Sequence, residues 1–98
     1  PQIEEFIFSK CDSDGTWYNA VEYCRSLGEE WTLPSSEQVE YIIDNYDIKF
    51  SSCWSNAEVN EKKAKAYHRG YTFPIMSTHK SSDNISIIAV KVVDKEVK

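Results

Sequence analysis

The chain has 98 residues, of which 41% are hydrophobic and 13% aromatic, and its formal net charge is −5. This length suits one small domain with a single core, over residues 1–98. The sequence contains no apolar run near the ~20 residues that a membrane-spanning helix needs, so we expect no membrane insertion. The 16 acidic residues outnumber the 11 basic residues. This excess argues against a nucleic-acid partner, because such binding relies on clustered Lys and Arg.

In chain order, the first expected elements are a strand and a helix. Bulky residues between positions 3 and 10 predict the strand. A helix is expected at about 17–27, because Thr16 can cap it and apolar residues follow at helical spacing. Gly28 suits a left-handed position just beyond its end. One side of this helix is therefore expected to be buried.

A second helix is predicted at about 36–46. Leu33 cannot easily continue a helix, because a residue before proline is pushed out of the helical region. Ser35 to Gln38 match a capping box, in which the serine hydroxyl accepts a backbone N–H and Gln38 reaches back. The apolar stripe of this helix consists of Val39, Ile42, Ile43 and Tyr46.

The second half of the chain changes to strand periodicity. Aromatic or β-branched runs at 53–55, 64–68, 71–76 and 85–93 are separated by Asn, Ser, Gly and Asp, which predicts an antiparallel sheet. The run 85–93 is the most hydrophobic, so we expect it to be a central strand. The basic stretch 62–69 alternates with Ala64 and Ala66, which we interpret as an exposed strand with charged edges. The alternative for that stretch is a surface for an acidic ligand or a partner.

Three segments together resemble a known family. They are Trp17-Tyr-Asn-Ala-Val-Glu-Tyr-Cys24, then Leu33-Pro-Ser35 with Glu37-Gln-Val-Glu40, and Cys53-Trp-Ser-Asn-Ala-Glu58. They resemble small bacterial C-type-lectin-like domains of the DUF1566 or Lcl C-terminal kind, and the two-helix part is also similar to formylglycine-generating enzymes. The resemblance implies an α+β, C-type-lectin-like fold, with two helices packed on a twisted antiparallel sheet and adjacent N- and C-terminal strands. It does not identify a function, because this fold hosts binders, enzymes and structural modules.

The three cysteines lack the usual pairing of that family. Its members commonly join a cysteine at the position of Cys24 to one in the closing strand, where this sequence has Ala89. We therefore expect Cys24 to be a small apolar core residue. A disulfide between Cys11 and Cys53 stays open, because the sequence does not give the separation of their Cα atoms.

Catalysis and metal binding are not expected. The downstream cysteine pair of formylglycine-generating enzymes is missing, and no spacing places His68 or His79 beside Cys53. The Glu-Pro-Asn, Gln-Pro-Asp and Trp-Asn-Asp motifs of calcium-dependent sugar binders are also missing. No zinc-ligand spacing occurs either. We expect no cofactor.

The preferred interpretation is a non-enzymatic binding or display module that recognises a protein or glycan ligand without calcium. The irregular middle, 48–82, mixes aromatic and small polar residues, a composition typical of contact surfaces. We expect Trp54 to be buried there. Exposure is expected for Tyr71, His79 and Lys80. The candidate ligand-binding residues are Tyr67, Arg69, Tyr71, His79 and Lys80.

A second interpretation is a structural component of a larger assembly, such as a phage virion decoration domain or an appendage of a bacterial surface protein. Adjacent termini, acidic charge and dispensable disulfides fit this role. A weaker alternative is a non-catalytic relative of formylglycine-generating enzymes. The first two interpretations favour a cell-surface, extracellular or virion location.

Overall fold

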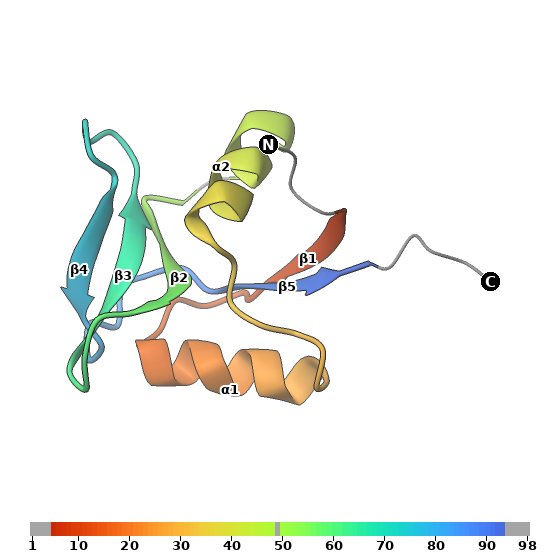
Figure 1. Ribbon diagram of the computed structural model, residues 1–98, viewed down its shortest axis with the longest axis horizontal. Coiled ribbons are helices and arrows are strands. Elements are labelled where there is room, and N and C mark those ends of the chain that lie inside the picture. The colour runs from red at the N-terminus through yellow and green to blue at the C-terminus, as the bar shows by residue number, and fades with distance from the viewer. Residues whose placement is uncertain (1–4, 49, 94–98) are drawn as a thin grey trace.

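The computed structural model describes residues 5–48 and 50–93. The elements follow one another in the order β1 (Phe6–Lys10), α1 (Trp17–Leu27), α2 (Ser36–Asn45), β2 (Ser52–Glu58), β3 (Lys63–His68), β4 (Ile75–His79) and β5 (Ile88–Val92). Figure 1 shows α1 and α2 on opposite sides of the β1–β5 pair, with β2, β3 and β4 gathered at one end of the molecule. Both helices lie where the sequence predicts them. Positions 3 and 4 of the predicted first strand lie outside the described residues.

Both helices begin at their predicted caps. The hydroxyl of Thr16 accepts the backbone N–H of Asn19 at 3.1 Å, and the Asn19 side chain accepts the N–H of Thr16 at 3.0 Å. Ser35 and Gln38 form the same reciprocal pair at 3.1 and 2.9 Å. Gly28, which ends α1, has a φ of 142°, a positive value that glycine adopts without a side-chain clash. The predicted capping box at α2 is confirmed, and α1 has one as well.

The C-terminal strand is buried, as its hydrophobicity predicts, but it forms a two-stranded sheet with β1 and is not the central strand of a larger sheet among the described residues. Along its whole length β5 pairs antiparallel with β1, so the N- and C-terminal strands are adjacent. On its other side, Thr32 and Val90 exchange two backbone hydrogen bonds of 2.9 and 2.8 Å. Just before β5, the N–H of Ser86 donates to the carbonyl of Ser52 at 3.0 Å, which links this segment to β2.

The remaining strands form a sheet in the order β2-β3-β4. Ala64 and Ala66 on β3 are buried and Lys65 is exposed, so the predicted alternation is confirmed. The expectation of an exposed strand is wrong, because β3 is paired on both sides and lies in the middle of the sheet. The strand predicted at 71–76 is shifted to Ile75–His79. Gly70, with a φ of 88°, turns the chain there, so Tyr71 lies in the connecting loop.

Two clusters of buried side chains form the core, one against α1 and one against α2. Trp54 is fully buried, as predicted, and its indole N–H donates to the carbonyl of Gly15 at 3.0 Å. Cys24 is a buried core residue, also as predicted. All three cysteines are free, so Cys11 and Cys53 form no disulfide.

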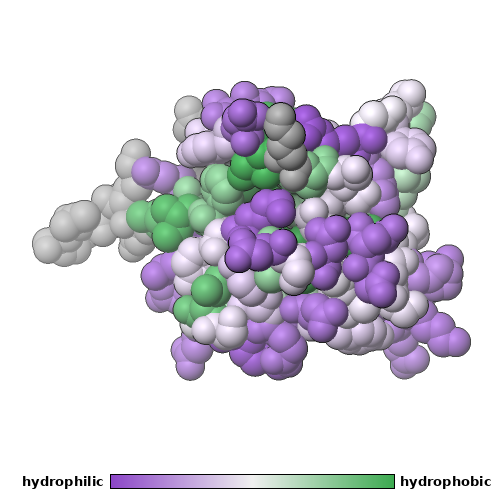
Figure 2. Space-filling model, turned by 180° about the vertical axis from the view of Figure 1, so that it is seen from behind, coloured by the Kyte–Doolittle hydropathy of each residue, from purple (hydrophilic) through white to green (hydrophobic). Residues whose placement is uncertain are grey.

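One face of the molecule is mainly polar. Figure 2, which views the molecule from behind, shows hydrophilic side chains over most of this face and only scattered apolar ones. Within residues 5–48 and 50–93, no helix has the length and apolar character needed to cross a membrane.

Candidate binding groove

The predicted ligand-binding residues lie at two opposite ends of the three-stranded sheet. Tyr67, Arg69 and Tyr71 lie at the end where β3 passes into β4, whereas His79 and Lys80 lie where β4 ends. Because β4 has 5 residues and a strand rises ~3.3 Å per residue, the two ends are roughly 16 Å apart. The structure therefore does not bring these residues into one site.

The connection between β3 and β4, residues 69–74, is here called the hairpin loop. Tyr71 is 62% exposed, as predicted, and Phe73 is 81% exposed. The guanidinium of Arg69 lies 5.5 Å from the ring centre of Phe50. Tyr67 is half-buried at the base of the loop, and this burial, with the negative charge of Glu40 as a smaller cause, raises its pKa. The hairpin loop thus presents two aromatic side chains to solvent.

His68 fastens the base of the hairpin loop. Its Nε2 lies 3.0 Å from the hydroxyl of Thr78, which also lies 3.2 Å from the carbonyl of Met76. Its Nδ1 lies 2.7 Å from the Ser52 hydroxyl, so a neutral ring can donate to one of the two hydroxyl groups and accept from the other. Burial lowers the pKa of His68, which agrees with a neutral ring in this arrangement. Side chains of β2, β3 and β4 are thereby linked through one imidazole.

The predicted exposure of Lys80 is wrong. Only 3% of this residue is exposed. Its ammonium group pairs with the carboxylate of Glu58 at 2.5 Å and lies 4.3 Å from the ring centre of Trp17. A polar loop composition does not reveal this burial, because the covering residue, Trp17, is distant in sequence. His79 is exposed, as predicted.

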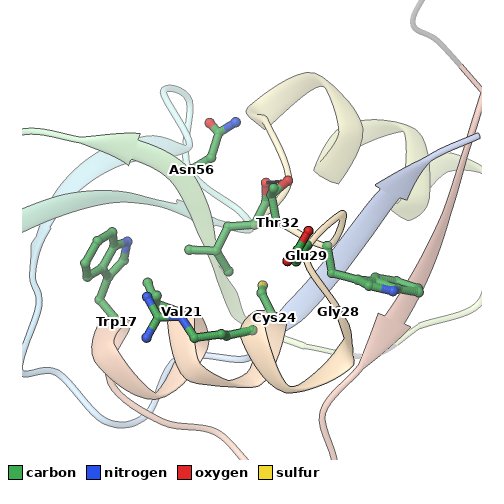
Figure 3. A pocket seen from close by; sticks show the side chains of 10 residues that line it. Trp17, Val21, Cys24, Gly28, Glu29, Thr32 and Asn56 are labelled. Atoms are coloured by element: carbon green, nitrogen blue, oxygen red, sulfur yellow. Dashed lines mark hydrogen bonds between the residues drawn. The ribbon is translucent and has the colours of Figure 1, made fainter.

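A groove that the sequence did not predict runs beside α1. It has a volume of about 410 Å³ and is here called the tryptophan groove. Its lining residues are Trp17, Val21, Cys24, Arg25, Gly28, Glu29, Trp31, Thr32, Leu33 and Asn56. Figure 3 shows Trp17 at the start of α1, the Cys24 sulfur pointing up from the helix into the groove, and Asn56 on the opposite side, on β2.

The two tryptophans are held by different contacts. The backbone N–H of Trp17 donates to the carbonyl of Lys80 at 3.0 Å, and the Lys80 ammonium lies over the Trp17 ring. Trp31 packs against Gly28, where an added Cβ would lie 3.4 Å from the Trp31 ring. From Trp17 to Gly28 the helix rises ~1.5 Å per residue, so the groove is roughly 16 Å long.

Two polar groups of the groove lack partners among the described residues. The indole Nε1 of Trp17 is buried and makes no hydrogen bond to them. The Glu29 carboxylate is exposed and has no ion pair with them, whereas Glu30 pairs with Lys91 at 3.0 Å. The exposed carboxylate is thus available to a ligand in a largely apolar groove, whereas the indole Nε1 is covered. Such a charged group gives a binding site its orientation and specificity.

The sequence alone indicated only some of the residues that line this groove. The apolar face of the first helix was predicted, and Trp31 stands in a polar loop directly after it. Asn56 could not be assigned, because its contribution depends on how β2 lies across from α1. Over 5–48 and 50–93, no three His, Cys, Asp or Glu side chains gather closely enough to hold a metal ion.

Comparison with known proteins bears on the fold. No protein-family model matches the chain, and no curated protein sequence matches it. Among solved structures, the chain is similar to the crystal structure of botrocetin, with a TM-score of 0.62, 94% of each chain covered and 12% sequence identity. The fold is therefore α+β and C-type-lectin-like. The resemblance to DUF1566 domains and to formylglycine-generating enzymes stays a prediction.

Proposed function

We propose that the protein is a non-enzymatic binding module that takes an extended segment of a protein ligand, with a basic side chain, into the tryptophan groove. The observation that carries this proposal is an apolar hollow of about 410 Å³, lined by two indoles, beside a carboxylate that has no ion pair among the described residues. The C-type-lectin-like fold shared with botrocetin is compatible with this role. A glycan ligand is the alternative, and neither ligand would need calcium.

The size of the groove supports a short segment as ligand. Sites for small ligands have volumes of about 300–1,000 Å³, and the groove falls in this range. An extended peptide rises ~3.3 Å per residue, so a groove roughly 16 Å long covers about five residues. Its apolar floor, with Val21 and Leu33, suits apolar side chains of such a segment.

The charges support a basic ligand. The Glu29 carboxylate lines the same groove as the Trp31 ring, and a cation is attracted both by a carboxylate and by an indole face. Arg25 adds little positive charge to the groove, because its guanidinium pairs with Glu22 at 2.8 Å. The formal net charge of −5 acts in the same direction over longer distances.

The state of the cysteines supports a non-enzymatic role. Burial raises the pKa of Cys24 to about 11 and that of Cys53 to about 12. At neutral pH fewer than about one in 10³ of these thiols is ionised, and the thiolate is the nucleophilic form. His68 is not available as a base for either, because both of its ring nitrogens are occupied by hydroxyl groups.

Selection and a matched pair of variants test the proposal. A library of short peptides and a panel of oligosaccharides would be screened against the chain, and the selected ligand measured by calorimetry. Glu29→Gln is expected to weaken a basic peptide about fivefold, the effect of losing one exposed ion pair. Glu30→Gln removes the same charge from the neighbouring residue and should leave the affinity unchanged, as should EDTA.

Three other results would contradict the proposal or change its ligand. Equal losses in the two glutamine variants would assign the effect to overall charge and would contradict binding in the groove. Loss of affinity on adding EDTA would contradict a metal-independent site. Selection of oligosaccharides but no peptide would replace the protein ligand with the glycan alternative.

A further inference from the structure

We propose that the free edge of β4 pairs antiparallel with β4 of a second copy of this chain, which forms a two-fold dimer with a continuous six-stranded sheet. This surface lies away from the tryptophan groove and includes the hairpin loop. It would give the protein a means of self-assembly in addition to ligand binding.

Backbone groups along β4 are available for such pairing. The N–H of His68 donates to the carbonyl of Pro74 at 2.8 Å, and the N–H of Lys80 donates to the carbonyl of Lys62 at 2.8 Å, so even-numbered positions of this segment face β3. Alternation along a strand then directs the N–H and C=O groups of Ile75 and Ser77 away from β3. β4 has β3 as its single neighbour in the described sheet. Figure 1 shows β4 at the outer margin of the molecule.

This edge lacks the usual protection against pairing. Soluble proteins commonly block edge strands with charged residues, bulges or proline within the strand. The sequence Ile75-Met-Ser-Thr-His79 contains no Lys, Arg, Asp or Glu, and its pairing with β3 has no register shift. Pro74 stands just before the strand and leaves its free groups accessible. An uncharged edge also allows two acidic chains to approach each other there.

The arrangement is self-complementary, which favours a second copy as the occupant. Antiparallel pairing centred on Ser77 would place Ile75 of one copy opposite His79 of the other. The hairpin loop with Phe73 would then reach the end of the second copy's β4. A shallow hollow of about 310 Å³ lies at that end, lined by Asn60, Glu61, Lys62, Lys63 and His79. Phe73, 81% exposed in one chain, would find a surface to cover it.

The same pairing would bring predicted ligand-binding residues from the two ends of the sheet close together. Tyr71 and Arg69 lie at the hairpin-loop end of the sheet and His79 lies at the other end. Across the two-fold axis the loop of one copy would lie beside His79 of the second copy. Lys65, next to Ser77 on β3, would be about 14 Å from its counterpart, three strand spacings away. This distance exceeds the ~8–10 Å screening length at moderate salt, so the lysines would repel weakly.

The dimer is expected to be weak. One pair of five-residue strands with a loop buries less than the ~1,200 Å² typical of stable complexes. Sedimentation equilibrium on the full chain, from micromolar to millimolar concentration, should show the mass rising from that of one chain toward twice that value. A mass that stays that of one chain throughout would overturn the proposal.

Variants at Ser77 test the geometry. Ser77→Pro removes an N–H that faces away from β3, so the monomer keeps its ladder while the dimer loses two central hydrogen bonds. It is expected to abolish association, as monitored by sedimentation, while circular dichroism stays unchanged. Ser77→Thr keeps the N–H and should associate like the original chain. Equal association of both variants would overturn the proposal.

A charge exchange separates pairing from any loss of folding. Ser77→Lys and Ser77→Glu should each be monomeric, because the introduced charge faces its own copy across the axis. An equimolar mixture should recover a dimer with one copy of each, as detected by native mass spectrometry. Mixtures that stay monomeric, or single variants that still associate, would overturn the proposal. The Glu29→Gln variant should associate normally, so failure of this proposal and of groove binding can be told apart.

Discussion

The two ends of the three-stranded sheet use aromatic and basic side chains in opposite ways. Where β4 ends, Lys80 is 3% exposed and lies between Glu58 and the ring of Trp17. At the hairpin loop, Tyr71 is 62% and Phe73 81% exposed. Similar residue types are therefore structural at one end and available for contact at the other. Composition alone does not distinguish the two roles.

The difference depends on the element that lies beyond each end. At the Lys80 end, the first residue of α1 closes the sheet, because the Trp17 N–H donates to the Lys80 carbonyl at 3.0 Å. The Lys80 N–H in turn donates to the turn before β3, at the carbonyl of Lys62. Among the described elements, Figure 1 shows no helix beyond the hairpin loop. The Lys80 end of the sheet is thus covered by the rest of the domain, whereas the hairpin-loop end is exposed to solvent.

The largest expected effect on stability comes from removing the buried side chain at the Lys80 end of the sheet. Lys80→Ala removes a buried stem, an ion pair and a cation–π contact, and should lower the free energy of unfolding by about 3 kcal/mol. Urea denaturation followed by tryptophan fluorescence would measure the change. Lys65→Ala is the matched control, since Lys65 is exposed on the same sheet, and its effect should stay within about 0.5 kcal/mol. Equal effects of the two substitutions would contradict a structural role for Lys80.

Local chemistry explains what the sequence could predict. A capping box involves residues three positions apart, so Ser35 and Gln38 identify the start of α2 without knowledge of the fold. The burial of β5 was likewise predictable, because a strand buried on both faces is continuously hydrophobic. The family resemblance supplied the way in which these elements assemble.

Contacts between distant segments explain what the sequence could not predict. The burial of Lys80 depends on Trp17, which lies on another element. The tryptophan groove combines α1, the following loop and Asn56 of β2, and no spacing in the chain relates them. The shift of β4 has a different cause. Tyr71 and Phe73 favour strands by type, yet the turn at Gly70 leaves them in the loop.

A smaller effect is expected from the histidine that fastens the hairpin loop. The pKa of His68 is lowered by burial in the folded protein, so the unfolded chain binds the proton more readily. Stability is then full above the ordinary histidine pKa of ~6.5 and declines as the pH falls below it toward the lowered value. Urea midpoints between about pH 8 and 5 should show this decline.

Two glutamine variants identify the residue responsible. His68→Gln should flatten the decline in stability below about pH 6.5, because the titrating group is gone. His79→Gln, at an exposed position on the neighbouring strand, should keep the decline of the original chain. The reverse pattern would show that the hairpin loop is not fastened by a neutral His68.

The smallest effect on stability is expected at the hairpin-loop end of the sheet. Phe73 is 81% exposed in the single chain, so Phe73→Ser should change the free energy of unfolding by less than about 0.5 kcal/mol in dilute solution. At millimolar concentration the same variant should associate less than the original chain, because the ring would no longer cover the hollow at His79 of the second copy. Sedimentation and urea denaturation of one preparation give both values. A large loss of stability in dilute solution would mean that Phe73 packs within its own chain, and the contrast between the two ends of the sheet would fail.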